Sequence, residues 1–277
     1  MDEAALQKRP RGRPRVHPAD EHSGTVQALD RGLTLLRALT RQGHSNLTDL
    51  ALSAGMPPSS AHRILMTLQK QGFVEFDEAG QEWFIGIEAF RVGSAYLVRT
   101  NLVEVALKVM RSLTNETGET ANLAIADDGS VVFVSQVETH NPIRAFFRPG
   151  TRSPMQASGI GKALLASMDR KAVEKILQKT GLPEFTEKTL TRPEDLFADL
   201  EQTRKRGWSL DDEERHTGMR CVAAAIHDAH GEPIAGISIS GPTVRFPDHA
   251  LAEMGSKVKA AAAQITTMIA GKIPDPH

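Results

Sequence analysis

Two serines near the C-terminal end of the sequence are placed so that their hydroxyls can bind one ligand. Ser238 and Ser240 lie in the segment Gly-Ile-Ser-Ile-Ser, where apolar and polar residues alternate. Because side chains alternate between the two faces of a β-strand, the two hydroxyls share one face and the isoleucines share the other. Hydroxyls side by side on an otherwise apolar strand predict a polar cavity next to a sheet.

A turn of small residues, Gln-Ala-Ser-Gly-Ile-Gly-Lys-Ala, leads into a predicted helix that starts at Gly159. The backbone amides of Gly159 and Ile160 would form an anion-binding helix N-terminus. The segment is not a P-loop, because Gln156 replaces the first glycine and Ala163 replaces the magnesium-binding hydroxyl. Close packing of the helix against a neighbour explains the glycines equally well, and the spacing leaves both interpretations open.

Four consecutive acids, Asp211 to Glu214, precede the only cysteine of the sequence, Cys221. Such a run is usually a solvated loop, and the alternative is that a single carboxylate accepts a hydrogen bond from a ligand hydroxyl or hydrate. Cys221 begins a predicted strand, where a cysteine is more often a small buried side chain than a reactive thiol.

An enzyme that uses the cysteine or a serine as nucleophile is a rival interpretation. The nucleophile-elbow pattern Gly-x-Ser-x-Gly is broken, since Gly236 precedes Ser238 but Ser240 replaces the second glycine. His227 and His230 are three residues apart, but no third metal ligand accompanies them at helical or hairpin spacing. We therefore expect no enzyme, no catalytic residue, no metal and no cofactor.

Residues 59–71 are predicted to form an amphipathic helix with one apolar side, composed of Ala61, Ile64, Leu65 and Leu68. The opposite side carries hydroxyls and cations, the groups that donate to phosphate oxygens and base edges of DNA. A lone helix of this kind would more simply present a solvated polar face. The candidate DNA-binding residues are Ser59, Ser60, His62, Arg63, Thr67 and Lys70.

The neighbouring segments favour DNA binding. Predicted helices over 25–42 and 47–54 precede this one, the second capped by Asn46, and Ser59 or Ser60 is the predicted cap of the third. A hairpin of short aromatic and β-branched runs follows at once. Three helices and a hairpin are typical of a winged helix-turn-helix, whose third helix enters the major groove.

From Thr120 onward the sequence alternates between predicted strands and helices. Paired strands are expected over 120–127 with 130–138 and over 220–228 with 232–241. Helices are expected over 87–98, 102–117, 159–168, 171–179, 194–206 and 248–270.

Residues 1–24 are predicted to form a disordered basic arm. Between Lys8 and Arg15 there are five positive charges, two prolines, one glycine and no acid. Arg11-Gly12-Arg13-Pro14 resembles an AT-hook, so Arg11 and Arg13 are expected to enter an A·T-rich minor groove. The alternative is a solubilising tail with nonspecific attraction to phosphates.

The chain has 277 residues, 40% of them apolar, and a formal net charge of -1. One cysteine excludes an intrachain disulfide and suits a reducing cytoplasm. Neither a membrane span nor a secretory signal is predicted, so we expect a cytoplasmic, nucleoid-associated protein. Residues 1–90 hold ten Lys and Arg against eleven Asp and Glu, so one copy would bind DNA modestly and a dimer reading two half-sites is favoured.

Several segments together resemble the IclR-type bacterial transcriptional regulators, and in particular the glyoxylate-shunt branch of that family. They are LDRGLTLLRAL, LTDLALSAGMPPSSAHRILMTLQKQGFV, GETANLAI, PMQASGIGKALLA, TRKRGWSLDDEERHTGMRCVAAAI and ISISGP. The resemblance covers residues 25–270 in one order, and its most specific motifs are the serine pair before His62-Arg63 and the combination of GMRC with ISISGP.

The resemblance implies an α+β chain with a winged helix-turn-helix domain, a linker helix and a GAF-like α/β effector-binding domain. It also implies homodimers and dimers of dimers (homotetramers). The expected boundaries are 1–24 for the arm, 25–86 for the DNA-binding domain, 87–101 for the linker helix and 102–272 for the effector-binding domain.

The small-acid site of the family maps onto the amides of Gly159 and Ile160 and onto Asp211, Cys221, Ser238 and Ser240. The sequence departs from the glyoxylate-shunt branch in the segment AFFRPGTRS, so Phe146, Phe147 and Ser153 are expected to reshape an apolar wall. No lysine or arginine belongs to the mapped set.

A compact carboxylate held by amides and hydroxyls is therefore expected, with a 2-oxoacid such as glyoxylate or pyruvate as the effector that controls a carbon-metabolism operon. The linker helix is the expected transmitter to the DNA-binding domain, and repression and activation both remain open. The alternatives are a regulator that senses an aromatic acid, an enzyme that processes a small acid with Cys221, and an architectural protein that relies on the basic arm alone.

Overall fold

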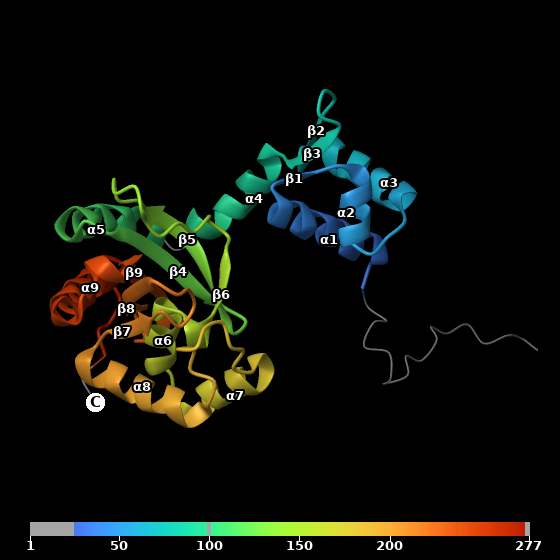
Figure 1. Ribbon diagram of the computed structural model, residues 1–277. Coiled ribbons are helices and arrows are strands. Elements are labelled where there is room, and N and C mark those ends of the chain that lie inside the picture. The colour runs from blue at the N-terminus through green and yellow to red at the C-terminus, as the bar shows by residue number, and fades with distance from the viewer. Residues whose placement is uncertain (1–24, 99–100, 275–277) are drawn as a thin grey trace, which may run out of the picture. The chain divides into compact units, whose positions relative to one another are not determined.

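The computed structural model describes residues 25–98 and 101–274, with the backbone alone for residues 95–98. The chain divides into two compact units, one ending at Tyr96 and the other beginning at Leu97 (Figure 1). Arg11 and Arg13 lie outside the described residues, so the expectations for the basic arm stay predictions.

The first unit contains helices α1 (Gln27–Gln42), α2 (Leu47–Ser53) and α3 (Pro58–Lys70). Asn46 caps α2 as predicted, because its Oδ1 accepts a hydrogen bond from the amide of Asp49 at 3.0 Å. The three helices enclose one apolar core around the fully buried side chains of Leu35, Leu39, Leu50, Ala61 and Leu65.

The predicted cap of α3 is wrong. Pro57 is the residue before the helix and Pro58 occupies its first turn, so Ser59 and Ser60 lie inside the helix. Proline suits this position because its fixed φ is helical and its missing N–H would have no partner there. The two hydroxyls are consequently not needed for capping.

Strands β2 (Val74–Asp77) and β3 (Glu82–Ile85) form the predicted hairpin. Asp77 closes its turn, because Oδ2 accepts a hydrogen bond from the amide of Gly80 at 2.8 Å. A short strand that the sequence pattern did not predict, β1 (His44–Ser45), pairs with β3 as the third strand of this sheet. Helix α4 (Ile87–Val98) follows the hairpin over the predicted range.

The second unit is built on an antiparallel sheet with the strand order β6-β5-β4-β9-β8-β7. These strands are β4 (Thr120–Asp127), β5 (Ser130–Val137), β6 (Arg152–Pro154), β7 (Ser209–Asp212), β8 (Met219–His227) and β9 (Pro233–Pro242). Strands β6 and β7 were not predicted. The acidic run is therefore not a solvated loop, because its first half is the edge strand β7.

Helices cover both faces of this sheet (Figure 1). Helices α5 (Leu102–Thr117) and α9 (Asp248–Met268) enclose a core with Ile237 and Ile239 of β9. On the other face a second core forms with α6 (Gly159–Ala166), α7 (Arg170–Thr180) and α8 (Pro193–Arg206). The alternation along β9 thus separates an apolar core from the face that carries Ser238 and Ser240, as predicted.

Candidate functional site

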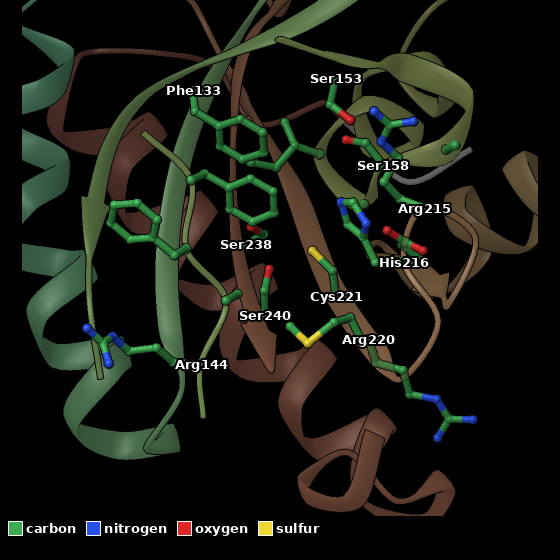
Figure 2. Close-up of a pocket in the computed structure, with 18 residues that line it drawn as sticks. Phe133, Arg144, Ser153, Ser158, Arg215, His216, Arg220, Cys221, Ser238 and Ser240 are labelled. Carbon is green, nitrogen blue, oxygen red and sulfur yellow. The ribbon is translucent and has the colours of Figure 1, made fainter. Parts of the chain in front are cut away.

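A cavity of about 200 Å³ lies in the second unit, between the sheet and the start of α6 (Figure 2). It is smaller than the roughly 300 to 1,000 Å³ of pockets that hold drug-sized ligands, which suits a compact molecule. All of the predicted effector-binding residues line it, namely Gly159, Ile160, Asp211, Cys221, Ser238 and Ser240.

The start of α6 presents its first amides at the cavity. Ser158 caps the helix, because its Oγ accepts from the amide of Gly161 at 3.1 Å, and its carbonyl accepts from the amide of Lys162. The amides of Gly159 and Ile160 come before these bonds and carry the positive end of the helix dipole. A Cβ at position 159 would meet the Sγ of Cys221 at 2.7 Å, so glycine here also allows close packing.

Strand register brings the polar residues of the sheet into two rows. Asp211 pairs with Cys221, and Cys221 pairs with Ser240 across β7, β8 and β9. In the neighbouring row, Ser238 pairs with Asn122 of β4. Side chains at paired positions lie on the same face of a sheet, so Asn122 lies on the cavity face of the sheet beside Ser238, which is more than 100 positions away in the chain.

A buried amide relay orients the two serine hydroxyls. Gln136 Nε2 donates to Asn122 Oδ1 at 2.7 Å, and Asn122 Nδ2 lies 3.2 Å from Ser240 Oγ and 3.5 Å from Ser238 Oγ. Because the serine oxygens accept from Asn122, their own hydrogens are left to donate to other acceptors, among them the sulfur of Cys221 at the cavity wall. This relay was not predicted from the sequence. The signal for it is Asn122, an amide side chain between apolar residues in the predicted strand Thr-Ala-Asn-Leu-Ala, and the structure buries it fully.

Asp211 is buried and braces the loop that follows β7. Its Oδ1 accepts from the amide of Glu214 at 2.8 Å. Burial raises the pKa of Asp211 to about 6, although the charge of Lys162 opposes the shift. The prediction that this acidic run is solvated is wrong for Asp211 and Glu214, which are 9% and 5% exposed.

Lys162 of α6 is fully buried and pairs with Glu214, which explains why this acid leaves the surface. Its Nζ lies 2.5 Å from Glu214 Oε1 and 3.0 Å from Asp199 Oδ2. Burial lowers the pKa of Lys162, but the charges of Glu214 and Asp199 together outweigh it, so the net shift is upward. Burial raises the pKa of Glu214 to about 7. The ion pair fixes the loop after β7 against the helix that starts at the cavity.

Cys221 directs its sulfur into the cavity (Figure 2). Shielding from bulk water raises the pKa of its thiol to about 11, so the sulfur is protonated at neutral pH. A protonated thiol is a weak nucleophile. Cys221 therefore acts as a small wall residue, in agreement with the structural interpretation of this cysteine.

Three arginines and a histidine that were not predicted also line the cavity, namely Arg144, Arg215, Arg220 and His216. The mapped effector set contains no arginine, so these three arginines are additional cavity residues. Arg144 and Arg220 belong to segments whose positions depend on how the whole sheet is assembled, so their sequence neighbours do not indicate that they line a cavity. Arg215 and His216 directly follow the acidic run. Because that run was expected to be a solvated loop, these two residues were not predicted to line a cavity. Burial and the charge of Arg215 lower the pKa of His216.

The apolar wall comes from the segment where the sequence departs from the glyoxylate-shunt branch. Phe146, Phe147 and Ser153 line the cavity as predicted, together with Phe133 of β5. The rings of Phe133 and Phe147 are stacked, with their centroids 4.3 Å apart and an angle of 6° between their planes.

On α3, the predicted DNA-binding side chains are free of the core. Ala61 and Leu65 are fully buried against α1 and α2, and Ile64 and Leu68 are partly buried. Ser60 is half-buried, while the other predicted side chains are exposed, namely Ser59, His62, Arg63, Thr67 and Lys70. The helix thus presents hydroxyls and cations on the side opposite its packed face.

Among the described residues, no group of three His, Cys, Asp or Glu side chains is arranged to hold a metal ion. His227 is buried and lies 3.4 Å from the hydroxyl of Ser167, while His230 is exposed beyond the strand end. No helix in the described part of the chain is both long and apolar enough to cross a membrane.

Two family models match the chain. The IclR helix-turn-helix domain matches residues 28–78, and the bacterial transcriptional regulator IclR C-terminal domain matches residues 94–267. The HTH-type transcriptional regulator BhcR of Paracoccus denitrificans is 48% identical over 265 residues, covering 95% of both chains. The transcriptional repressor IclR of Escherichia coli is 44% identical over 265 residues, covering 94% of this chain and 96% of that protein.

The crystal structure of the Thermotoga maritima IclR superposes with a TM-score of 0.72 at 28% identity, covering 87% of this chain and 98% of that chain. These relatives are transcriptional regulators and not enzymes, in agreement with the expectation from the broken nucleophile elbow. With its helix-turn-helix unit, its cavity-bearing sheet domain and matches over almost its whole length, the chain belongs to the IclR family of bacterial transcriptional regulators.

Proposed function

We propose that this regulator binds a small carboxylate in the cavity of its second unit and changes its affinity for operator DNA in response. The observation that carries the proposal is the convergence of all the predicted effector residues on one cavity of about 200 Å³. We further propose a 2-oxoacid such as glyoxylate or pyruvate as the effector, and a carbon-metabolism operon as the target.

The two polar ends of such an acid match two groups of donors in the cavity. The amides of Gly159 and Ile160 suit a carboxylate, because a helix N-terminus attracts negative charge. The hydroxyls of Ser238 and Ser240, with their oxygens already accepting from Asn122, suit the carbonyl or hydrate oxygens. Asp211 is near enough in the same row of the sheet to exchange a hydrogen bond with a hydrate.

An aromatic acid is the second candidate, and the phenylalanine wall favours it. Phe133, Phe146 and Phe147 give the cavity apolar surface that a two-carbon acid would not fill. Aromatic rings stack favourably on such side chains. The choice between the two candidates rests on size, because a ring of six carbons occupies far more of the cavity than glyoxylate does.

A thermal-shift screen of the full chain tests the effector class, because a ligand that binds only the folded state raises its stability. Glyoxylate, pyruvate and benzoate are the probes. A shift with the 2-oxoacids supports the proposal, and a shift with benzoate alone replaces it with the aromatic alternative. A chain that responds to none of these acids, in the screen and by calorimetry, contradicts the proposed effector class.

We propose that α3 reads the major groove through Ser59, Ser60, His62, Arg63, Thr67 and Lys70, and that Arg11 and Arg13 add minor-groove contacts. Homodimers or dimers of dimers would place two such helices on neighbouring half-sites. Deletion of residues 1–24 should lower affinity and flatten its salt dependence while sequence preference persists. Loss of all sequence-specific binding on this deletion would favour the architectural alternative.

A response to the effector requires that it binds one arrangement of the regulator more tightly than another. We propose α4 as the transmitter, since it is the helix that joins the two units along the chain. Titration of operator DNA with and without glyoxylate gives the sign, as release in a repressor or as tighter binding in an activator. Equal DNA affinity in both titrations would contradict the coupling.

A further inference from the structure

One of the three arginines of the cavity lacks a carboxylate partner among the described residues. Arg144 pairs with Glu138 at 2.7 Å, and Arg220 pairs with Asp212 at 2.5 Å and with Asp248 at 2.7 Å. Arg215 forms no such pair in the part of the chain that the structure describes. Its positive charge is therefore available to a bound molecule.

The guanidinium of Arg215 is held in place by an aromatic ring. Its Cζ lies 3.9 Å from the centroid of the Phe185 ring, in a cation–π arrangement. Stacking uses one face of the guanidinium plane and leaves the N–H groups at its edge free to donate. An arginine that is stacked but not paired is thus preorganised for an anion.

Phe185 places this charge near the start of α6. The segment that carries Phe185 is joined to the turn before the helix, because Gln156 Nε2 lies 3.5 Å from the carbonyl of Pro183. Ser158, the cap of α6, follows Gln156 by two positions. In Figure 2 the guanidinium of Arg215 lies toward the same end of the cavity as the hydroxyls of Ser153 and Ser158.

The backbone of Arg215 is fixed by buried groups on its N-terminal side. Glu214 is anchored to Lys162, and the amide of Glu214 donates to Asp211. Few backbone torsions are left to move between this anchor and the arginine. The cation therefore reaches the cavity from a rigid base, which lowers the entropy lost when it binds an anion.

We propose that Arg215 forms the ion pair with the effector's carboxylate and thereby makes the cavity selective for acids over neutral molecules of the same size. The inference rests on the proposed function and adds a specificity-determining residue to it. A guanidinium fits a carboxylate with two parallel, charge-assisted hydrogen bonds, whereas the amides of α6 and the serine hydroxyls carry no full positive charge. It also offsets the negative charge that the effector brings beside Asp211.

Isothermal titration of the full chain with glyoxylate and with pyruvate tests this proposal. Arg215→Gln should weaken the binding of both acids about ten- to a hundredfold, the range expected for loss of a charge-assisted hydrogen bond. Arg215→Lys keeps the charge without the planar fork and should give an intermediate loss. Glycolaldehyde, a neutral molecule of similar size, should bind weakly and equally to the wild type and both variants.

Arg170→Gln is the matched control. Arg170 also stacks on a phenylalanine, with its Cζ 4.3 Å from the ring centroid of Phe197, but it does not line the cavity. The Arg170→Gln variant should bind both acids as the wild type does. Thermal unfolding without ligand should show that all variants fold.

The outcomes separate this inference from the proposed function. Wild-type affinity for both acids in Arg215→Gln would overturn the role of Arg215 and leave the effector class intact. If Arg215→Gln does not fold, the wild-type chain decides, because equal affinity for glyoxylate and for glycolaldehyde would overturn the selectivity for acids that the ion pair is proposed to give. A wild-type chain that binds neither acid would overturn both proposals.

Discussion

The Nζ of Lys162 lies 2.5 Å from Oε1 of Glu214, and both side chains are buried. This contact joins the first turn of α6 to the loop that follows β7. Both elements contribute cavity residues, so the buried ion pair determines the distance between two sides of the candidate site.

Lys162→Met should lower the free energy of unfolding by about 3 to 5 kcal/mol, because it leaves Glu214 buried without a counter-ion. Denaturant titration at pH 8 measures the loss. The pKa of Glu214, about 7, lies above its ordinary value of 4.5, so protonation stabilises the fold as the pH falls. The loss should therefore be smaller at pH 5.5 than at pH 8.

Lys188→Met is the control for the buried pair. Lys188 lies 2.6 Å from Glu213 at the surface, with 49% of its side chain exposed. Exposed pairs contribute about 0 to 1 kcal/mol, so this variant should unfold almost as the wild type does. Equal losses in both lysine variants would show that burial of the Lys162 pair has no special energetic role.

Effector affinity should depend on pH through Asp211. Its pKa of about 6 means that the carboxyl changes from charged to neutral as the pH falls from 7.5 to 5. The effector remains an anion over this range, so loss of the like charge should tighten binding by about tenfold for each unit by which the bound anion raises the pKa of Asp211. Calorimetry with glyoxylate in a pH series measures the effect.

Asp211→Asn keeps an oxygen that can accept from the amide of Glu214, so it removes the charge and preserves the loop contact. The tightening that Asp211 causes should be lost in this variant, and any tightening that remains as the pH falls belongs to the protonation of His216 in the same cavity. Tighter binding above pH 6 in the wild type would contradict the repulsion argument and would instead indicate that the ionised carboxylate accepts from an effector hydroxyl.

The double substitution Ser238→Ala and Ser240→Ala should abolish the calorimetric signal for 2-oxoacids while operator binding persists. Each lost hydrogen bond weakens binding by about 0.5 to 1.5 kcal/mol, and the unpaired amide of Asn122 adds to the cost. Ser256→Ala, on the exposed face of α9, is the control. Unchanged heat in the double variant would move the effector site elsewhere.

Arg63→Ala should weaken specific DNA binding by about 1 to 3 kcal/mol if Arg63 contacts a base edge. Its side chain is exposed on α3, so the unliganded fold should be unaffected. A mobility-shift titration at fixed salt, with operator and scrambled DNA, distinguishes a base contact from a phosphate contact. Arg152→Ala, an exposed arginine of the second unit, controls for the loss of one charge.

An Arg63→Ala variant that binds operator as tightly as the wild type would remove this residue from the recognition set. An equal loss on both DNAs would assign Arg63 to the phosphate backbone.

The parts of the fold that were predictable depend on local patterns. The alternation of apolar and polar residues along β9 predicted that Ser238 and Ser240 share one face. The turn residues around Asp77 predicted the hairpin of β2 and β3. The cap of α3 was missed because both Pro58 and the serines suit a helix start, and packing of the helix decides between them.

The rest of the candidate site depends on contacts between distant segments. Burial of Glu214 requires Lys162 on another element, and a run of four acids carries no local sign of that partner. The stack of Arg215 on Phe185 likewise brings together segments 30 positions apart, which periodicity does not reveal. The strand β1 has two residues, which is too short for an alternation of apolar and polar residues to be recognised.

The alternation of β9 has a genetic consequence. Ile237 and Ile239 lie in the core with α5 and α9, whereas Ser238 and Ser240 face the cavity. Saturation mutagenesis along this strand should therefore yield two phenotypic classes that alternate codon by codon. Alleles at the isoleucine codons should reduce protein abundance, and alleles at the serine codons should leave an abundant regulator that occupies its operator but no longer responds to its signal.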